Sequence, residues 1–136
     1  MKQADFESFI MELPNVQREE IFGYSFFFVG DDHRLPFVTI AHSDNDYDHV
    51  SNLDREDVFR LNIGVSSETF NNLIASEAEE GMDYTALNVF LPHPQYSRQH
   101  FVCILNPVGD TAEKTKQLIA EAHFIAENRL QRKGGS

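Results

Sequence analysis

Five polar residues with the chemistry of a binding site fall into two short stretches of this sequence. Arg60 and Asn62 lie in the stretch VFRLNIGV, and His93, Arg98 and His100 lie in the stretch PHPQYSRQHF. An arginine offers five N–H donors, whereas an asparagine amide and a neutral imidazole can each donate and accept. Such a set suits an anion or another polar ligand, provided that the fold brings the two stretches together.

The pattern of apolar residues predicts how these side chains are placed. In residues 58–65, apolar residues occupy the odd positions from 59 onward, and Arg60 and Asn62 occupy even ones. This two-residue period is typical of a half-buried strand. The run Phe101–Leu105 is apolar throughout, which favours a central strand. If the two strands are neighbours and helices cover only the other face, the five polar residues share an open face. An ordinary solvated face is the alternative, since antiparallel sheets commonly keep one face wet.

Segments with the apolar spacing of helices precede and follow these strands in the sequence. Residues 5–13 repeat apolar side chains at helical spacing, and residues 111–131 do the same over a longer run. Asp110 is placed for a capping box at the start of the long helix. Ser66 or Ser67 is placed to cap a shorter helix between the two stretches.

Two further strands and two short segments complete the pattern. Tyr24–Val29 and Pro36–Ala41 are rich in strand-forming residues and are separated by a polar loop, which predicts a hairpin. Residues 77–81 resemble the end of the short helix, and residues 84–91 fit either a helix or a strand. Together, the predicted strands and helices indicate an α+β fold: an antiparallel sheet of four to five strands with the N- and C-terminal helices packed on one face.

Length and composition favour one globular unit. A chain of 136 residues with 41% hydrophobic residues fits a single domain. We expect it over residues 1–131, followed by a flexible tail over residues 132–136. The one cysteine, Cys103, excludes an internal disulfide and suits a reducing compartment. No apolar run reaches the about 18 residues of a membrane span, and the first residues lack the apolar core of a signal peptide. These features predict a cytoplasmic protein.

The net charge restricts the partners. Acidic residues number 22 against 11 basic ones, which gives a net charge of −11, and the basic residues are scattered. Duplex DNA and anionic membranes carry dense negative charge and bind basic patches. Nucleic acid is therefore disfavoured as a partner, and we expect no membrane partner. A small molecule or another protein remains, and the sequence leaves the oligomeric state open.

Patterns that would point to metal binding or catalysis are incomplete. The run Asp44–Asp48 starts like a calcium loop, but His49 and Arg55 stand where such a loop needs glycine and glutamate. A solvated acidic loop is the better interpretation. Cys103 and His100 lie on opposite faces of a strand because they are three positions apart, so Cys103 fits a packing role better than that of a nucleophile. The six histidines form no zinc motif, and no glycine-rich phosphate loop occurs. We therefore expect no catalytic residue, no metal and no cofactor.

Several segments also carry a family resemblance. It lies in SNLDREDVFRLNIGVSSETF, in LPHPQYSRQHFVCILNP and in the final helix AEKTKQLIAEAHFIAENRL, and it extends over about residues 22–130. These segments resemble a bacterial family of small proteins that is defined only as a domain of unknown function. More distantly, the order of elements is similar to that of the YjbR (MmcQ) family. That resemblance implies an α+β fold of the kind compared with the frataxin-like CyaY fold, and DNA binding of the proposed double-wing type.

The functional prediction is a non-enzymatic binding or interaction domain that uses the open face of the sheet. Its predicted ligand-binding residues are Arg60, Asn62, His93, Arg98 and His100. A small metal-assisted enzyme that uses His93 or His100 is one alternative. DNA binding by analogy with YjbR-like proteins is the other.

Overall fold

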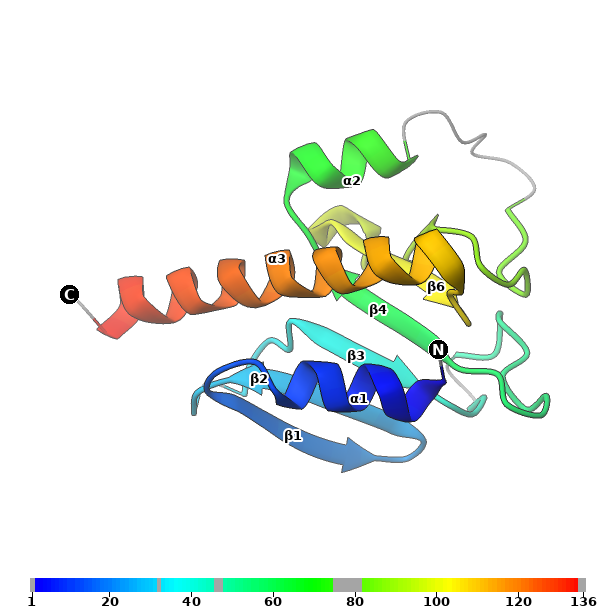
Figure 1. Ribbon diagram of the computed structural model, residues 1–136, viewed down its shortest axis with the longest axis horizontal. Coiled ribbons are helices and arrows are strands. Elements are labelled where there is room, and N and C mark those ends of the chain that lie inside the picture. Colours follow the sequence, from blue (N-terminus) through cyan, green and yellow to red (C-terminus); the bar gives the residue numbers. More distant parts are fainter. Residues whose placement is uncertain (1, 32, 46–47, 75–81, 135–136) are drawn as a thin grey trace.

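The chain forms an antiparallel sheet that carries its helices on one face (Figure 1). The computed structural model describes residues 2–31, 33–45, 48–74 and 82–134. Along the chain, the elements are helix α1 (Gln3–Met11), strands β1 (Val16–Ile21), β2 (Tyr24–Val29), β3 (Val38–Ala41) and β4 (Arg60–Gly64), helix α2 (Ser67–Ile74), strand β5 (Leu91–Pro92), the 3-10 helix η1 (Ser97–Gln99), strand β6 (Phe101–Leu105) and helix α3 (Gly109–Gly134). The strands lie in the order β1-β2-β3-β4-β6-β5, and every neighbouring pair is antiparallel.

The predicted α+β class with helices on one face is confirmed, and the sheet has six strands rather than the four or five expected. The two edge strands, β1 and β5, account for the difference. The β1 sequence VQREEI is mostly polar and exposed, so it lacks the apolar alternation by which a strand is recognised. Charged residues are common on edge strands because they discourage pairing with other chains. β5 has two residues, too few to show a period.

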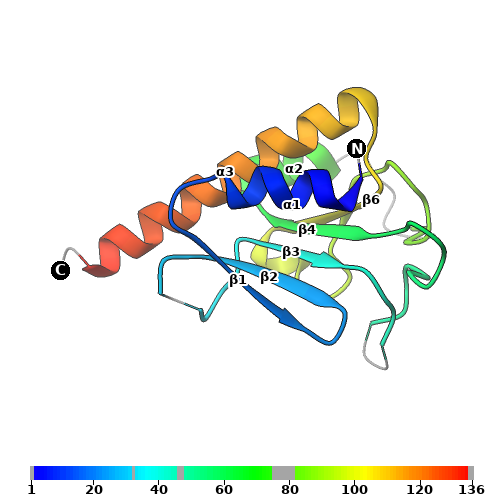
Figure 2. The same ribbon diagram turned by 60° about the horizontal axis from the view of Figure 1, so that its bottom comes forward.

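The buried core lies between the sheet and the helices. In Figure 2 the helices lie above the sheet, and the opposite face, which we call the open face, is turned downward. The core side chains alternate along the strands and recur at helical spacing along α1 and α3; they include Phe6, Ile10, Phe27, Val38, Ile40, Leu61, Ile63, Val102, Ile104, Leu118 and Ile119. Each such side chain contributes about 1.5–3 kcal/mol on burial. The same alternation sends the intervening residues of each strand to the open face.

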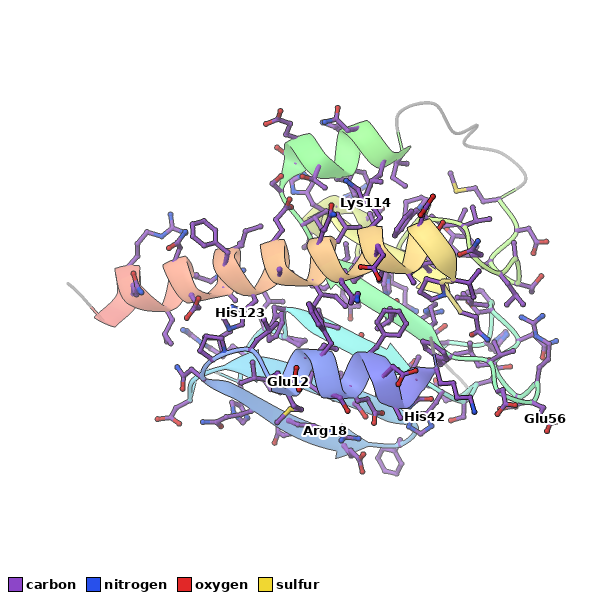
Figure 3. All side chains as sticks on the ribbon, viewed as in Figure 1. Glu12, Arg18, His42, Glu56, Lys114 and His123 are labelled. Atoms are coloured by element: carbon purple, nitrogen blue, oxygen red, sulfur yellow. The ribbon has the colours of Figure 1, made fainter. Side chains whose placement is uncertain are left out.

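His123 attaches α3 to the chain that leaves α1. It projects from α3 toward the sheet (Figure 3), and its ring centroid lies 5.4 Å from that of Phe37. Its Nε2 lies 2.7 Å from the carbonyl oxygen of Pro14 and donates a hydrogen bond to it. This buried histidine therefore has a structural role.

The helices begin near their predicted positions. The Ser66 Oγ accepts a hydrogen bond of 3.1 Å from the backbone N–H of Thr69, as expected for the cap of α2. Helix α3 begins at Gly109, so Asp110 lies in its first turn rather than at its cap. A carboxylate is favourable there as well, because the positive end of the helix dipole lies close to it.

The remaining segments are irregular. Residues 84–90 form turns and bends, and only Leu91–Pro92 pairs as a strand. The expected end of α2 at residues 77–81 lies outside the described residues. α3 continues as a helix beyond residue 131, to Gly134. Within the described part of the chain, no helix is both long and apolar enough to cross a membrane.

Candidate functional site

The open face of the sheet holds a pocket of about 430 Å³. Its floor comes from β3 and β4, one side comes from β2, and the other side comes from the segment between β5 and β6. We call it the open-face pocket. Its lining is aromatic at the sides and polar at the floor, and it consists of Tyr24, Phe26, Arg34, Leu35, Pro36, Thr39, Asp48, Arg60, Asn62, His93, Gln95, Tyr96 and Phe101.

A buried ion pair forms the centre of the floor. Arg60, which is fully buried, donates through Nη1 and Nη2 to the two carboxylate oxygens of Asp48. Its Nε donates to Oδ1 of Asn62 at 3.0 Å, and Nη1 also donates to Oγ of Ser51 at 3.1 Å. Asn62 in turn donates to Oγ1 of Thr39 at 2.8 Å. A buried guanidinium is tolerated only when it is paired and hydrogen-bonded, so this network explains how an arginine can occupy the middle of the sheet.

The groups around Asp48 set the charge of the floor. The Tyr24 hydroxyl donates to Oδ2 of Asp48 at 2.7 Å and accepts a hydrogen bond of 3.0 Å from Nδ2 of Asn45. Burial alone would raise the pKa of Asp48, but the hydrogen bonds and the charge of Arg60 outweigh it and hold that pKa below the ordinary 3.8. Burial, followed by the hydrogen bond to Asp48, raises the pKa of Tyr24 to about 12. At neutral pH the floor therefore holds one cation, one anion and a neutral phenol, and its charges cancel.

Aromatic rings flank this polar floor on two sides. On the β2 side, the ring centroids of Tyr24 and Phe26 lie 5.8 Å apart in a stacked arrangement. On the other side, the ring centroid of Tyr96 lies 6.4 Å from that of Phe101 and 5.0 Å from that of His93. A ligand on the floor would therefore meet ring faces and edges at both ends.

Phe101 can lie beside the pocket because a glycine faces it on the neighbouring strand. β4 and β6 pair Gly64 with Phe101, and a Cβ at position 64 would lie 2.9 Å from Cζ of that ring. This separation is far below a van der Waals contact, so any side chain at position 64 would displace the ring. Glycine within a strand often marks such a close approach.

His93 is buried and is held by the turn that follows it. Its Nδ1 lies 3.0 Å from the backbone nitrogen of Gln95 and 3.0 Å from that of Tyr96. Both backbone groups are donors, so Nδ1 accepts, and the proton of the neutral ring lies on Nε2. Burial, followed by the charge of Arg60, lowers the pKa of His93 from 6.5 to about 4. The imidazole is therefore neutral near pH 7.

The structure brings together three of the five residues predicted to bind a ligand. Arg60, Asn62 and His93 line the open-face pocket, whereas Arg98 and His100 are not part of its lining. Arg98 lies exposed in η1. His100 has a left-handed backbone with φ of 64°, and its ring lies 5.7 Å from a phenylalanine of α2, on the helix side of the sheet. Its expected position on the open face is therefore not observed.

Asp48 is the most important residue of the pocket that the sequence pattern does not identify. It belongs to a run interpreted as a solvated acidic loop, yet it is only 8% exposed and is paired with Arg60. That interpretation is wrong for Asp48. A signal was present, because an arginine on a buried strand requires a nearby carboxylate and the acidic run is close to it in sequence. Asp46 and Tyr47 of the same run lie outside the described residues.

Two other predictions concern reactive groups. Cys103 is fully buried, and burial raises the pKa of its thiol to about 12. A thiol in this state is inert, so the predicted packing role is confirmed. Among the residues that the structure describes, no three or more His, Cys, Asp or Glu side chains are grouped so that they could hold a metal ion.

The fold and the site define a small α+β protein with a ligand-sized pocket on the uncovered face of its sheet. The chain belongs to the family of unknown function DUF6194, which matches residues 1–135. No curated protein and no solved structure matches the chain significantly. The predicted relation to a domain of unknown function is thereby confirmed, and the more distant similarity to YjbR stays a prediction.

Proposed function

We propose that the protein is a non-enzymatic binding domain whose open-face pocket takes a small molecule. The observation that carries this proposal is the pocket itself, which combines a buried, fully hydrogen-bonded Arg60–Asp48 pair with aromatic sides. Pockets for small molecules typically have about 300–1,000 Å³, mostly apolar walls and a few convergent polar groups. At about 430 Å³, the open-face pocket fits this description.

The pKa shifts within and below the pocket support binding rather than catalysis. A general acid or base works best with a pKa near the operating pH. Here the pKa of His93 falls to about 4, and the pKa values of Tyr24 and Cys103 rise to about 12. The pKa of Asp48 is lowered as well. Each of these groups is shifted away from neutrality, and such shifts stabilise a fixed protonation state instead of proton transfer.

The proposal is tested by mapping amide shifts in two-dimensional NMR spectra against a panel of small organic compounds. We expect the shifts to concentrate on β2, β4 and residues 92–101. The variant Tyr96→Ala removes one half-exposed wall of the pocket and should weaken the binding of the same compounds. Phe124→Ala removes a similarly exposed ring from α3, which is not part of the pocket lining, and should leave binding unchanged. The proposal is overturned if no compound shifts the pocket amides, or if the shifts map elsewhere on the protein.

The alternatives are distinguished by their own experiments. Specific DNA retention at low salt would favour the analogy with YjbR-like proteins, although the net charge of −11 opposes it. Tight binding of zinc or manganese by purified protein would favour a metal-assisted enzyme. A cytoplasmic location, which the single buried cysteine suits, is part of the proposal.

A further inference from the structure

Among the described residues, His93 gives the open-face pocket a hydrogen-bond donor, Nε2–H, that makes no hydrogen bond. Both backbone N–H groups of the turn point at Nδ1 of His93, so the only proton of the neutral ring lies on Nε2. No hydrogen bond to Nε2 occurs within the described residues, and every buried side-chain nitrogen or oxygen among them has a partner. Nε2 is therefore not sealed off from solvent. Since His93 lines the pocket, its N–H is available to an acceptor there.

The remaining polar groups of the floor are occupied by one another. Arg60 uses its Nε, Nη1 and Nη2 on Asn62, Asp48 and Ser51. The charge of Asp48 cancels that of Arg60. A charged ligand would therefore lose its hydration without meeting an unpaired countercharge on the floor, which is costly.

The surroundings of the pocket do not compensate for this loss. Arg34 lies at the pocket but is exposed, where water and salt screen its charge. The net charge of −11 repels anions at longer range. A cation would meet Asp48 only after displacing Arg60, since the carboxylate already accepts from Arg60 and Tyr24.

Aromatic rings at two sides of the pocket favour a flat ligand. Two of its sides are built from rings, with Tyr24 and Phe26 at one end and Tyr96 and Phe101 at the other. Aromatic side chains pack best against other planar groups, by offset stacking or by edge-to-face contact.

We infer that the ligand of the open-face pocket is an uncharged, planar molecule that presents an acceptor, such as an amide-type carbonyl oxygen, to Nε2–H of His93. This inference rests on the proposed function and narrows its ligand class. It assigns His93 the role of a specificity-determining donor. Of the two ligand classes predicted from the sequence, an anion or another polar molecule, the inference keeps the second, because Asp48 neutralises Arg60.

The test uses matched compounds that share a ring and differ only in charge. Benzamide, benzoate and benzamidine form one set, and the corresponding naphthalene amide, carboxylate and amidine form a second, larger set. Dissociation constants are measured from amide shifts of the pocket residues near pH 7.5. We expect each amide to bind at least about tenfold more tightly than its charged relatives, because the charged compounds lose more hydration free energy on entering the pocket than the amide does.

The variant His93→Asn tests the role of the donor. Asparagine Oδ1 can replace Nδ1 as acceptor for the turn, but the Nε2 donor is lost. We expect an affinity for the amides that is roughly fivefold to tenfold weaker, as is typical for the loss of one hydrogen bond, and little change for the carboxylates. Arg98→Ala, outside the pocket, should change neither. Equal or tighter binding of a carboxylate, or unchanged amide binding by His93→Asn, would overturn the inference and leave the proposed function intact. If no compound of either set shifts the pocket amides, the proposed function fails together with the inference.

Discussion

The buried histidine of the open-face pocket makes the stability of the protein depend on pH in a predictable way. Burial, followed by the charge of Arg60, lowers the pKa of His93 from 6.5 to about 4. In addition, Nδ1 can take up a proton only if it gives up two hydrogen bonds from the turn. We therefore expect the folded protein to lose stability as the pH falls, because His93 binds a proton in the unfolded chain at a pH at which it stays neutral in the folded protein.

The sign and the size of this stability change follow from the pKa of His93 in the unfolded and in the folded protein. The contribution of His93 is fully present above pH 6.5 and is lost between pH 6.5 and about 4. Within that window, each pH unit changes the free energy of unfolding by about 1.4 kcal/mol. Lowering the pH from about 7.5 to about 5.5 crosses roughly one unit of the window, so the expected loss is about 1.4 kcal/mol.

Urea unfolding of the wild type and of His93→Asn at these two pH values measures the effect. The isoelectric point of about 4.8 makes lower pH unsuitable, since proteins associate readily without net charge. Because the two proteins differ only at position 93, the contributions of all other groups cancel in the difference between them. We expect the wild type to lose about 1.4 kcal/mol more than the variant. Equal losses in the two proteins would refute the reasoning, as would an NMR titration that gives His93 an ordinary pKa.

Three further predictions concern the residues at and below the pocket. Arg60→Met leaves Asp48 buried without its partner and should lower the free energy of unfolding by about 3–5 kcal/mol in urea. Gly64→Ala places a methyl group against the ring of Phe101, and the resulting overpacking should cost about 1–3 kcal/mol, visible as a lower melting temperature. Cys103, with its pKa raised to about 12, should react with an aromatic disulfide reagent near pH 8 at least about 100-fold more slowly in the folded than in the unfolded protein.

Each of these predictions has a matched comparison. Arg98→Met changes an exposed arginine and should alter stability by at most about 0.5 kcal/mol, so a similar loss for both arginine variants would contradict the role of the ion pair. Combining Gly64→Ala with Phe101→Leu makes room for the methyl group and should recover part of the lost stability. The absence of any recovery would show that the ring is not the cause. Rapid labelling of Cys103 in the folded protein would show that the thiol is not sealed beneath the pocket.

Most of the fold can be predicted from the periodic spacing of apolar residues in the sequence. The alternation in residues 58–65 predicts both the strand and the faces of Arg60 and Asn62, and both are observed. Patterns fail where both faces of a strand are apolar. His100 lies on the helix side, as Val102 and Ile104 do, but the run Phe101–Leu105 is apolar throughout and does not indicate which of its residues face the helices.

The pocket itself was harder to predict than the strands that carry it. Asp48 reaches Arg60 from an irregular loop, and such a contact leaves no periodic trace in a single sequence. Tyr24 lies in a predicted strand, but the sequence pattern places its partner Asp48 in a solvated loop. Tyr96 lies in a turn whose geometry depends on the hydrogen bonds to His93. The site is therefore defined by long-range side-chain contacts, whereas the fold is defined by local pattern.

The alternation of Leu61 and Ile63 with Arg60 and Asn62 along β4 also bears on how the chain finds its correct strand pairing. A slip of β4 by one residue would turn every side chain to the other face of the sheet. Arg60 would then enter the apolar layer beneath the helices without Asp48, at a cost of several kcal/mol. A mispaired chain would thus be unstable as well as unable to form the pocket. Arg60 and Asn62, which line the pocket, therefore also disfavour the wrong register of β4.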